Sequence, residues 1–521
     1  MMRLIIILAI MLPACLMRAQ QLLPEPNKCE RHSGEFVLSR GVNIVADCPE
    51  AEKAAAQFRT ALNERKRLPK SKRGTVIFSL TAPADSLSEA YSIRVMPDSV
   101  VMSAQSARGL RYAQSSLLQL ADAGKGKVEA CHIDDAPGYS WRGFMLDESR
   151  HFFGKEKVKQ YLDVMYRLKL NVFHWHLTDE PGWRIEIKQY PELTRKGAIG
   201  NWHDAHAEPR FYTQNEIREI VAYAAERGIM VVPEFDMPGH ATSACRAYPE
   251  LSGGGDGRWD GFTFHPCKES TFTFISNVLD ELVQLFPAPY IHIGGDEVHY
   301  VNQNWYRDPE IQQFITDHQL VDERGLEHYF VHRVADIVAS KGKTMIGWDE
   351  IVDSEVSPKK AIVMWWRHER RHQLLKALER GYRVILTPRL PMYGDFVQDA
   401  SHRIGRYSQG NTIAQVYHFP ADIAHLFKGY ENQIMGMQMS LWTERIADGS
   451  RLDFMTFPRL FAVAEAAWTP LEKRNFEDFE QKLPDWLHWL KSIGIGFYNP
   501  FDPDSTPEPW GPDKQDILKE G

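Results

Sequence analysis

Two adjacent carboxylates, Asp296 and Glu297, end the stretch YIHIGGDE of this 521-residue chain. The aromatic and β-branched residues at 290–293 are typical of a buried strand, and the acids follow where that strand would end. Gly294 and Gly295 allow another group to approach the backbone closely. The same Gly-Gly-Asp-Glu sequence is also typical of a plain polar turn, so the rest of the chain has to decide between a site and a turn.

Cleavage of a glycosidic bond is the chemistry that such a pair of acids suggests. It needs one carboxylic acid to protonate the leaving oxygen and an anionic or nucleophilic group beside the oxocarbenium-like transition state. Because neighbouring residues of a regular strand point to opposite faces, Asp296 and Glu297 reach one site only if the backbone leaves strand geometry near the two glycines. The residues alone leave open whether Asp296 attacks the sugar directly or does something else.

From residue 140 onward the pattern repeats strand, loop and helix. Apolar stretches predict eight short buried strands, at residues 141–146, 171–177, 229–235, 290–293, 344–348, 361–366, 383–386 and 434–441. The clearest of the intervening helices begins with a capping box of Thr213 and Glu216 and stops at Gly228. Eight such units predict a parallel (β/α)8 TIM barrel, and the alternative is a doubly wound open sheet. No Gly-x-Gly-x-x-Gly fingerprint follows the first strand, which disfavours the dinucleotide-binding form of that sheet.

A TIM barrel carries its active site at the C-terminal ends of its strands, and acids and aromatic residues gather at those places in this sequence. After the eight predicted strands in turn stand Arg150; His174, His176 and Asp179; His240; Asp296 and Glu297; Trp348; Trp366; Tyr393 and Asp395; and Trp442 and Glu444. Each one taken singly is more often a helix cap or a packed side chain. Their coincidence at all eight ends favours a site that stacks on a sugar ring and binds its hydroxyls.

Composition and charge bound the remaining possibilities. The chain is 43% hydrophobic and 25% charged, which fits a globular protein with one large and one smaller domain. The formal net charge is -8, and the sequence has no basic block that would indicate nucleic-acid binding. An oligosaccharide or glycan is therefore the expected partner.

The sequence before the barrel predicts a separate domain. Short strands at 36–38, 42–45, 76–78, 91–95 and 100–103, with helices at 51–63 and 110–120, predict a small noncatalytic α+β domain over residues 21–135. It carries no constellation of acids, histidines or glycines. The catalytic barrel then covers residues 136–500, and residues 501–521 form a C-terminal tail.

Residues 1–20 look like a signal peptide, because Arg3 precedes an apolar run that ends at Leu12 and small residues follow. That run is too short to span a membrane and no later stretch qualifies, so we expect an exported protein without a transmembrane segment: periplasmic, on the cell surface or secreted. The Leu-Pro-Ala-Cys sequence ending at Cys15 loosely resembles a lipoprotein signal and leaves a lipid anchor open.

Five cysteines remain after the signal peptide, an odd number. Export permits disulfides, and Cys245 and Cys267 flank a glycine-rich loop at 252–257 that a disulfide between them could hold together. None of the cysteines has the spacing of a zinc site. The sequence therefore predicts no metal and no other cofactor.

The chain resembles the exo-acting β-N-acetylhexosaminidases of glycoside hydrolase family 20 over nearly its whole mature length. The resemblance rests on HIGGDE at 292–297, HWHLTD at 174–179, PEFDMPGH at 233–240 and GWDE at 347–350, in the family's order. Residues 21–135 look like the family's noncatalytic N-terminal domain. The resemblance implies that the 2-acetamido oxygen of the substrate is the nucleophile, with an oxazolinium intermediate and net retention.

The same resemblance assigns roles to the residues at the strand ends. Glu297 would act first as general acid and then as general base, while Asp296 would orient the acetamido group and stabilise its developing positive charge. Tyr393 would form a hydrogen bond to the acetamido carbonyl. The other implied substrate contacts are a wall of Trp348, Trp366 and Trp442, hydroxyl ligands in Arg150, Asp395 and Glu444, and a supporting pair of Asp179 and His240. Strand alternation points Trp366 into the barrel and its neighbour Trp365 outward.

Three alternatives stay open at this point. His240 could instead be a structural histidine that tethers a loop. An endo-acting chitinase-like hydrolase would use the same acetamido chemistry, although its Asp-x-x-Asp-x-Asp-x-Glu pattern is missing from the sequence. An inactive sugar-binding barrel is the third alternative, and intact Asp296, Glu297 and Tyr393 disfavour it. Glu180 and Pro181 depart from the family's usual residues and could alter subsites beyond the first sugar.

Overall fold

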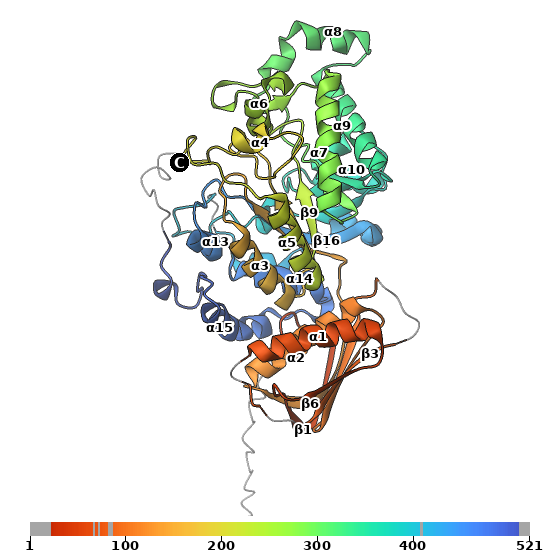
Figure 1. Cartoon of the computed structure of the whole chain (residues 1–521), viewed down its shortest axis with the longest axis vertical. Helices are drawn as coiled ribbons and strands as arrows, with labels where there is room; N and C mark the ends of the chain where they lie inside the picture. Colours follow the sequence, from red (N-terminus) through yellow and green to blue (C-terminus); the bar gives the residue numbers. More distant parts are fainter. Residues whose placement is uncertain (1–21, 66–67, 71–72, 82–86, 407–409, 510–521) are drawn as a thin grey trace, which may run out of the picture.

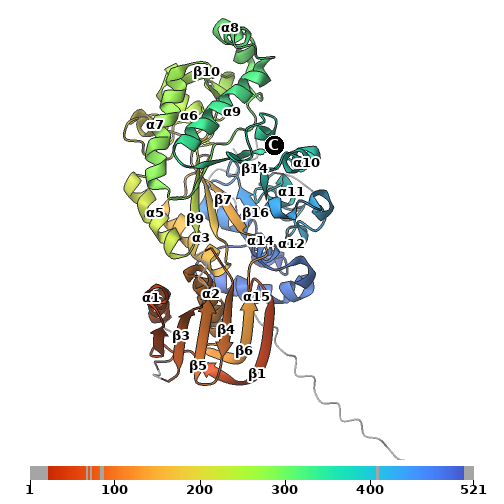
Figure 2. The same cartoon turned by 90° about the vertical axis from the view of Figure 1, so that its right-hand side faces the viewer.

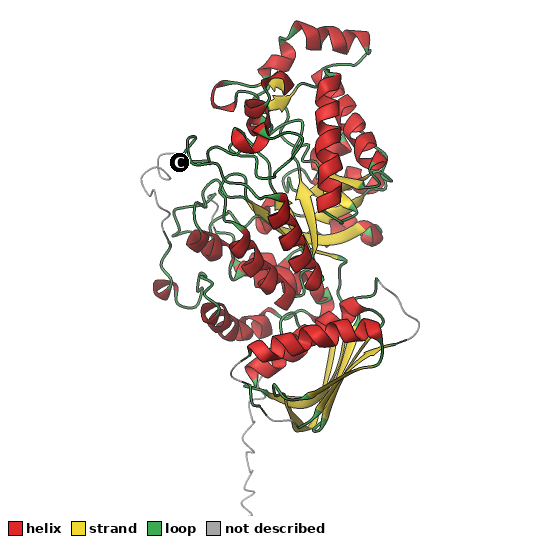
Figure 3. Cartoon of the chain, in the orientation of Figure 1, coloured by secondary structure: helices red, strands yellow, loops and turns green. Residues whose placement is uncertain are grey.

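The computed structural model describes residues 22–65, 68–70, 73–81, 87–406 and 410–509. The predicted signal peptide and Cys15 lie outside these residues. The chain forms a small domain of one sheet with two helices, joined to a larger domain of strands surrounded by helices (Figures 1 and 3).

The small domain is a mixed six-stranded sheet in the order β1-β6-β4-β5-β3-β2. Its strands are β1 (Lys28–Val37), β2 (Asn43–Ala46), β3 (Thr75–Leu80), β4 (Tyr91–Val95), β5 (Ser99–Ala104) and β6 (Lys127–Asp135). Helices α1 (Pro49–Glu64) and α2 (Ala107–Ala123) cover one face, the face toward the barrel (Figures 1 and 2). The predicted α+β domain is confirmed.

Two strands of this sheet were not predicted over most of their length. All residues of β1 except Phe36 are exposed or half-buried on one edge of the sheet, so the strand lacks the alternating apolar residues that sequence analysis detects. Its pairing partner β6 is also missing from the prediction. Antiparallel pairing of β1 with β6 supplies the hydrogen bonds that define both strands.

The large domain is a closed barrel of eight parallel strands, which confirms the predicted TIM fold. In chain order the strands are β7 (Trp141–Asp147), β8 (Val172–His176), β9 (Met230–Glu234), β12 (Tyr290–His292), β13 (Thr344–Trp348), β14 (Ala361–Trp365), β15 (Arg383–Leu386) and β16 (Ile434–Leu441). All eight coincide with predicted strands to within two residues. Pairing of β16 with β7 closes the barrel.

Helices surround the barrel, as the figures show (Figures 1 and 2). The main ones are α3 (Lys155–Arg167), α5 (Gln214–Glu226), α7 (Glu269–Leu285), α9 (Glu323–Ser340), α10 (Arg371–Glu379), α14 (Arg459–Trp468) and α15 (Phe476–Ser492). Shorter elements in the connections are α4 (Glu192–Arg195), α6 (Thr242–Ala247), β10 (Ser252–Gly254), β11 (Thr263–Phe264), α8 (Pro309–Asp317), α11 (Arg389–Met392), α12 (Ile413–His418) and α13 (Gly449–Thr456). The predicted capping box of Thr213 and Glu216 begins α5, and Gly228 follows that helix with φ of 73°.

A buried polar cluster joins the two domains. Trp468, the last residue of α14, packs in the core of the small domain and donates to Asp135 at 3.0 Å. The fully buried Lys169 lies 3.0 Å from the same carboxylate, and Tyr91 donates to it at 2.5 Å. Because these donors come from both domains, the small domain is attached to the barrel by specific hydrogen bonds in addition to apolar contact.

The disulfide suggested between Cys245 and Cys267 is not formed, because both residues are free thiols. The thiol of Cys245 packs near the carbonyl oxygen of Thr263 at 3.7 Å, whereas Cys267 packs against a separate apolar cluster that contains Trp305. The glycine-rich loop is held by β10 pairing with β11 instead. Among the described residues, no helix combines the length and apolarity needed to cross a membrane.

Candidate active site

Aromatic side chains line the inside of the barrel at its C-terminal end. Trp348, Trp366, Tyr393 and Trp442 all belong to the apolar cluster of the lumen. The rings of Trp366 and Tyr393 are nearly parallel, at 10° with centroids 6.4 Å apart, and Trp442 lies 6.1 Å from Tyr393. Trp365 packs in the outer core instead, so the predicted direction of this Trp pair is confirmed.

The backbone leaves strand geometry just before the two acids, which allows both side chains to face one site. Strand β12 ends at His292, and Gly294 and Gly295 follow with φ of 67° and 88°. Glu297 is itself left-handed, with φ of 51°, a conformation that is uncommon outside glycine and marks local strain. Asp296 and Glu297 therefore lie outside regular strand geometry at the C-terminal end of β12, and the predicted departure near the two glycines is confirmed.

His240 lies beside both acids, although their environments differ. Its Nε2 is 3.5 Å from Oδ2 of Asp296 and 3.9 Å from Oε2 of Glu297. The Asp296 side chain is 11% exposed, whereas the Glu297 side chain is 42% exposed. Even so, crowding by protein raises the pKa of Glu297, with Asp296 adding to the rise and His240 opposing it. A carboxyl with a raised pKa at an open position is suited to donate a proton.

A chain of ion pairs supports His240 from the other side. Its Nδ1 lies 3.1 Å from Asp179 and 2.9 Å from Glu180. Arg150 contacts Asp179 directly and lies 3.4 Å from Glu180. Burial opposes ionisation of Asp179, but Arg150 and His240 outweigh it and hold its pKa well below the usual value. The structure thus brings together Arg150, Asp179 and His240, which the sequence had placed at three different strand ends.

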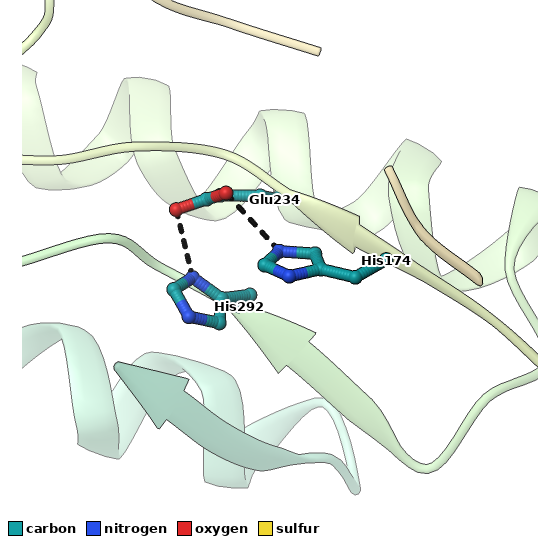
Figure 4. A group of neighbouring side chains, drawn as sticks. All are labelled: His174, Glu234 and His292. Atoms are coloured by element: carbon teal, nitrogen blue, oxygen red, sulfur yellow. Dashed lines mark ion pairs between the residues drawn. The ribbon is translucent and has the colours of Figure 1, made fainter. Parts of the chain in front are cut away.

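Glu234, the last residue of β9, is a buried hub that the sequence analysis did not assign. His176 Nδ1 and His174 Nε2 lie 2.5 Å and 3.1 Å from its Oε2, and His292 Nδ1 and Trp348 Nε1 lie 2.9 Å and 3.0 Å from its Oε1. Figure 4 shows the carboxylate between His174 and His292. Burial disfavours its charge, yet the histidines hold the pKa of Glu234 well below the usual value. Polar residues inside otherwise apolar strands were the available sequence signal.

Arg406 is a second residue that sequence analysis missed. It lies in the connection between β15 and β16, with Nε 2.7 Å from Asp395 and Nη2 3.1 Å from Glu444. Burial raises the pKa of Asp395 to about 6, against the effect of Arg406. Arg150, which like Glu444 is a predicted hydroxyl ligand, pairs with Asp179 and lies 5.0 Å from the Trp442 ring centroid. An arginine in an irregular loop carries no local pattern that identifies it.

Several groups of these side chains have the atom types that bind metals. One consists of His174, Glu234 and His292, and another of Asp179, Glu180 and His240, each with its polar atoms within 4.8 Å of one another. Within both groups the atoms already contact each other at distances typical of direct hydrogen bonds. The expectation that the protein needs no metal stays a prediction.

Comparison with protein families assigns most of the chain. Residues 139–471 match the model "Glycosyl hydrolase family 20, catalytic domain", and residues 19–136 match "Glycosyl hydrolase family 20, domain 2". A beta-hexosaminidase of Porphyromonas gingivalis is 37% identical over 79% of this chain, which spans only 55% of that protein's length. One of Vibrio furnissii is 34% identical, over 87% of this chain and 77% of the relative.

Solved structures agree with the family models. An exo β-N-acetylglucosaminidase of Vibrio harveyi in complex with N-acetylglucosamine is similar at a TM-score of 0.83 and 32% identity, over 94% of this chain and 80% of that one. A β-N-acetylhexosaminidase of Bacteroides fragilis is similar at a TM-score of 0.78 and 32% identity, over 91% and 96%. Fold, order of domains and catalytic-domain match agree: the chain belongs to glycosyl hydrolase family 20.

Proposed function

We propose that this family 20 hydrolase removes terminal, non-reducing β-linked N-acetylglucosamine or N-acetylgalactosamine from glycans, with retention of configuration. The observation that carries the proposal is the turn at Asp296 and Glu297. It places one buried and one open carboxyl beside the same imidazole of His240, inside an aromatic wall. A buried acid is suited to bind the acetamido group, and an open acid with a raised pKa is suited to exchange protons with the leaving group and water.

In the first step, the acetamido oxygen of the substrate attacks the anomeric carbon while the bond to the leaving oxygen breaks. Glu297 donates its proton to that oxygen, so the departing sugar leaves as an alcohol. Asp296 accepts the acetamido N–H and stabilises the positive charge of the oxazolinium ion. The hydroxyl of Tyr393, whose pKa is held well above its usual value chiefly by burial, stays protonated and donates to the acetamido oxygen.

In the second step, Glu297 has become a carboxylate and takes a proton from water. The resulting hydroxide attacks the anomeric carbon, the acetamido oxygen leaves it, and Glu297 regains its proton for the next turnover. Two displacements at the same carbon give net retention. His240 lies within 4 Å of Glu297 and carries positive charge, because Glu180 and Asp179 outweigh the effect of burial and raise its pKa well above the usual value. That charge stabilises the carboxylate form of Glu297 between the steps.

We infer action at chain ends from the residue types at the barrel mouth. The rings of Trp348, Trp366 and Trp442 in the lumen are suited to stack on one sugar ring, and the carboxylates of Asp395 and Glu444 are suited to accept hydrogen bonds from its hydroxyls. The structure of a Vibrio harveyi relative in complex with N-acetylglucosamine supports this choice of sugar. We further propose that the protein is exported, on the basis of its first twenty residues.

The decisive assay compares hydrolysis of an aryl β-N-acetylglucosaminide with that of the matching aryl β-glucoside. We expect the first to be cleaved and the second to be almost inert, and equal rates would refute acetamido participation. Chitooligosaccharides labelled at the reducing end then distinguish exo from endo cleavage by the size of the first products. Glu297→Gln should lower kcat by about 10²- to 10⁴-fold, the usual contribution of a general acid or base. The exposed Glu219→Gln is the matched control, with unchanged kcat.

A further inference from the structure

Asp236 is a buried carboxyl to which the proposed reaction gives no role. It lies two residues beyond β9 and is 2% exposed. Asp236, His240 and Asp296 each place a polar atom within 4.8 Å of the others. A Cβ atom on Gly294 would lie 1.6 Å from Oδ1 of Asp236. Glycine at 294 is therefore required to make room for Asp236, in addition to permitting the positive φ of the turn.

Ionised Asp236 would be poorly compensated at this position. In the part of the chain that the structure describes, no group donates a hydrogen bond to its Oδ1. The nearby charged groups are the carboxylates Asp296 and Glu234 and the imidazoles His240 and His176. Burial first, and then the charge of Asp296, raise the pKa of Asp236 well above its usual value. The neutral carboxylic acid removes the buried charge, but it has an O–H that needs an acceptor.

Asp296 is the acceptor that best fits that O–H. Glu234 also places an oxygen within 4.8 Å of Asp236, but each of its oxygens already has a hydrogen-bond partner, Trp348 on Oε1 at 3.0 Å and His176 on Oε2 at 2.5 Å. His240 is held as an imidazolium by Glu180 and Asp179, so neither of its nitrogens accepts. Asp296 has an oxygen, Oδ1, that no described donor reaches. A proton on Asp236 thus satisfies two buried carboxyl groups with one hydrogen bond.

We propose that Asp236 is a positioning residue that stays protonated through turnover and donates a hydrogen bond to Asp296. One oxygen of Asp296 is thereby fixed, and the other is left for the acetamido N–H of the substrate. The pair of carboxyl groups carries one negative charge, located on Asp296, where the positive charge of the oxazolinium ion develops. This inference rests on the proposed acetamido mechanism and adds the group that orients its buried carboxylate.

Two substitutions distinguish a role of Asp236 as a hydrogen-bond donor from a role as a negative charge. Asp236→Asn keeps the shape and offers an N–H to Asp296, whereas Asp236→Ala removes the donor. We expect kcat of the Asn variant to stay within about tenfold of wild type, and kcat of the Ala variant to fall by about 10- to 100-fold below the Asn variant with little change in KM. If Asp236 acted as a second negative charge, Asn would be as damaging as Ala, and that result would overturn the proposal.

A spectroscopic readout tests the proton without reference to rate. Infrared spectra of wild type at neutral pH should contain the carbonyl stretch of a protonated carboxylic acid that Asp236→Asn lacks and the exposed Asp163→Asn retains. Absence of that band in wild type overturns the proposal. The aryl glucoside comparison is made with wild type alone. Failure of acetamido selectivity there refutes the proposed function, whereas a selective wild type with a disabled Asn variant refutes only the role of Asp236.

Discussion

Glu234→Gln should destabilise the protein strongly while leaving its shape unchanged. The carboxylate accepts hydrogen bonds from Trp348 on Oε1 at 3.0 Å and from His176 on Oε2 at 2.5 Å, and His292 and His174 lie 2.9 Å and 3.1 Å from the same two oxygens. A glutamine amide replaces one oxygen with an NH₂ group, so either Trp348 or His176 would lose its acceptor, and the negative charge among the three histidines would be lost. The three histidines and Trp348 around it are buried, so the lost acceptor leaves a buried donor unpaired. Breaking a buried ion pair on one side costs about 3–5 kcal/mol, and we expect the unfolding free energy to fall by that amount.

The loss of unfolding free energy in Glu234→Gln should depend on pH. The folded pKa of Glu234 is depressed, so its contribution is present above its ordinary pKa of 4.5 and is lost as pH falls through the folded value. The pKa of His176 is raised well above 6.5, because Glu234 and Asp179 outweigh burial. Its contribution is full below 6.5 and is lost as pH rises through the folded pKa. The difference between wild type and variant is therefore largest between these two limits.

Urea unfolding of wild type, Glu234→Gln and the surface control Glu219→Gln at several pH values measures this difference. Glu219 pairs with Lys155 and Lys159 in solvent, where ion pairs contribute little to stability, so the control should unfold close to wild type. A Glu234→Gln variant that also stays within about 1 kcal/mol of wild type near neutral pH would refute the assignment of Glu234 as a charged hub.

Two more substitutions test other parts of the structure. Arg406→Ala removes the cation that opposes protonation of Asp395, whose pKa is about 6, so the acidic limb of the kcat/KM profile for an aryl β-N-acetylglucosaminide should move to higher pH. An unmoved limb would show that Asp395 does not control binding. Lys169→Met leaves Asp135 without its buried cation and should lower the unfolding free energy by about 3 kcal/mol, measured by urea unfolding. Unchanged stability would show that the junction between the domains does not depend on this pair.

Much of the architecture is encoded locally in the sequence. Continuous apolar stretches located all eight barrel strands, because strands covered by helices are buried on both faces. The capping box at Thr213 is likewise a contact between residues three positions apart. Strand alternation was sufficient to direct Trp366 inward and Trp365 outward. Edge strand β1 was missed because its residues are mostly exposed and its hydrogen bonds come from β6.

The sequence by itself determined that Asp296 and Glu297 end a strand and that two glycines release the backbone there. Only the tertiary structure decided what each acid faces. Pairing of β9 with β8 on one side and β12 on the other brings Glu234 to the histidines and Asp236 close to Asp296. Arg406 reaches Asp395 and Glu444 through a loop that has no periodic pattern. The physical reason is that secondary structure follows from spacing along the chain, whereas burial and charge at a site depend on residues from distant segments.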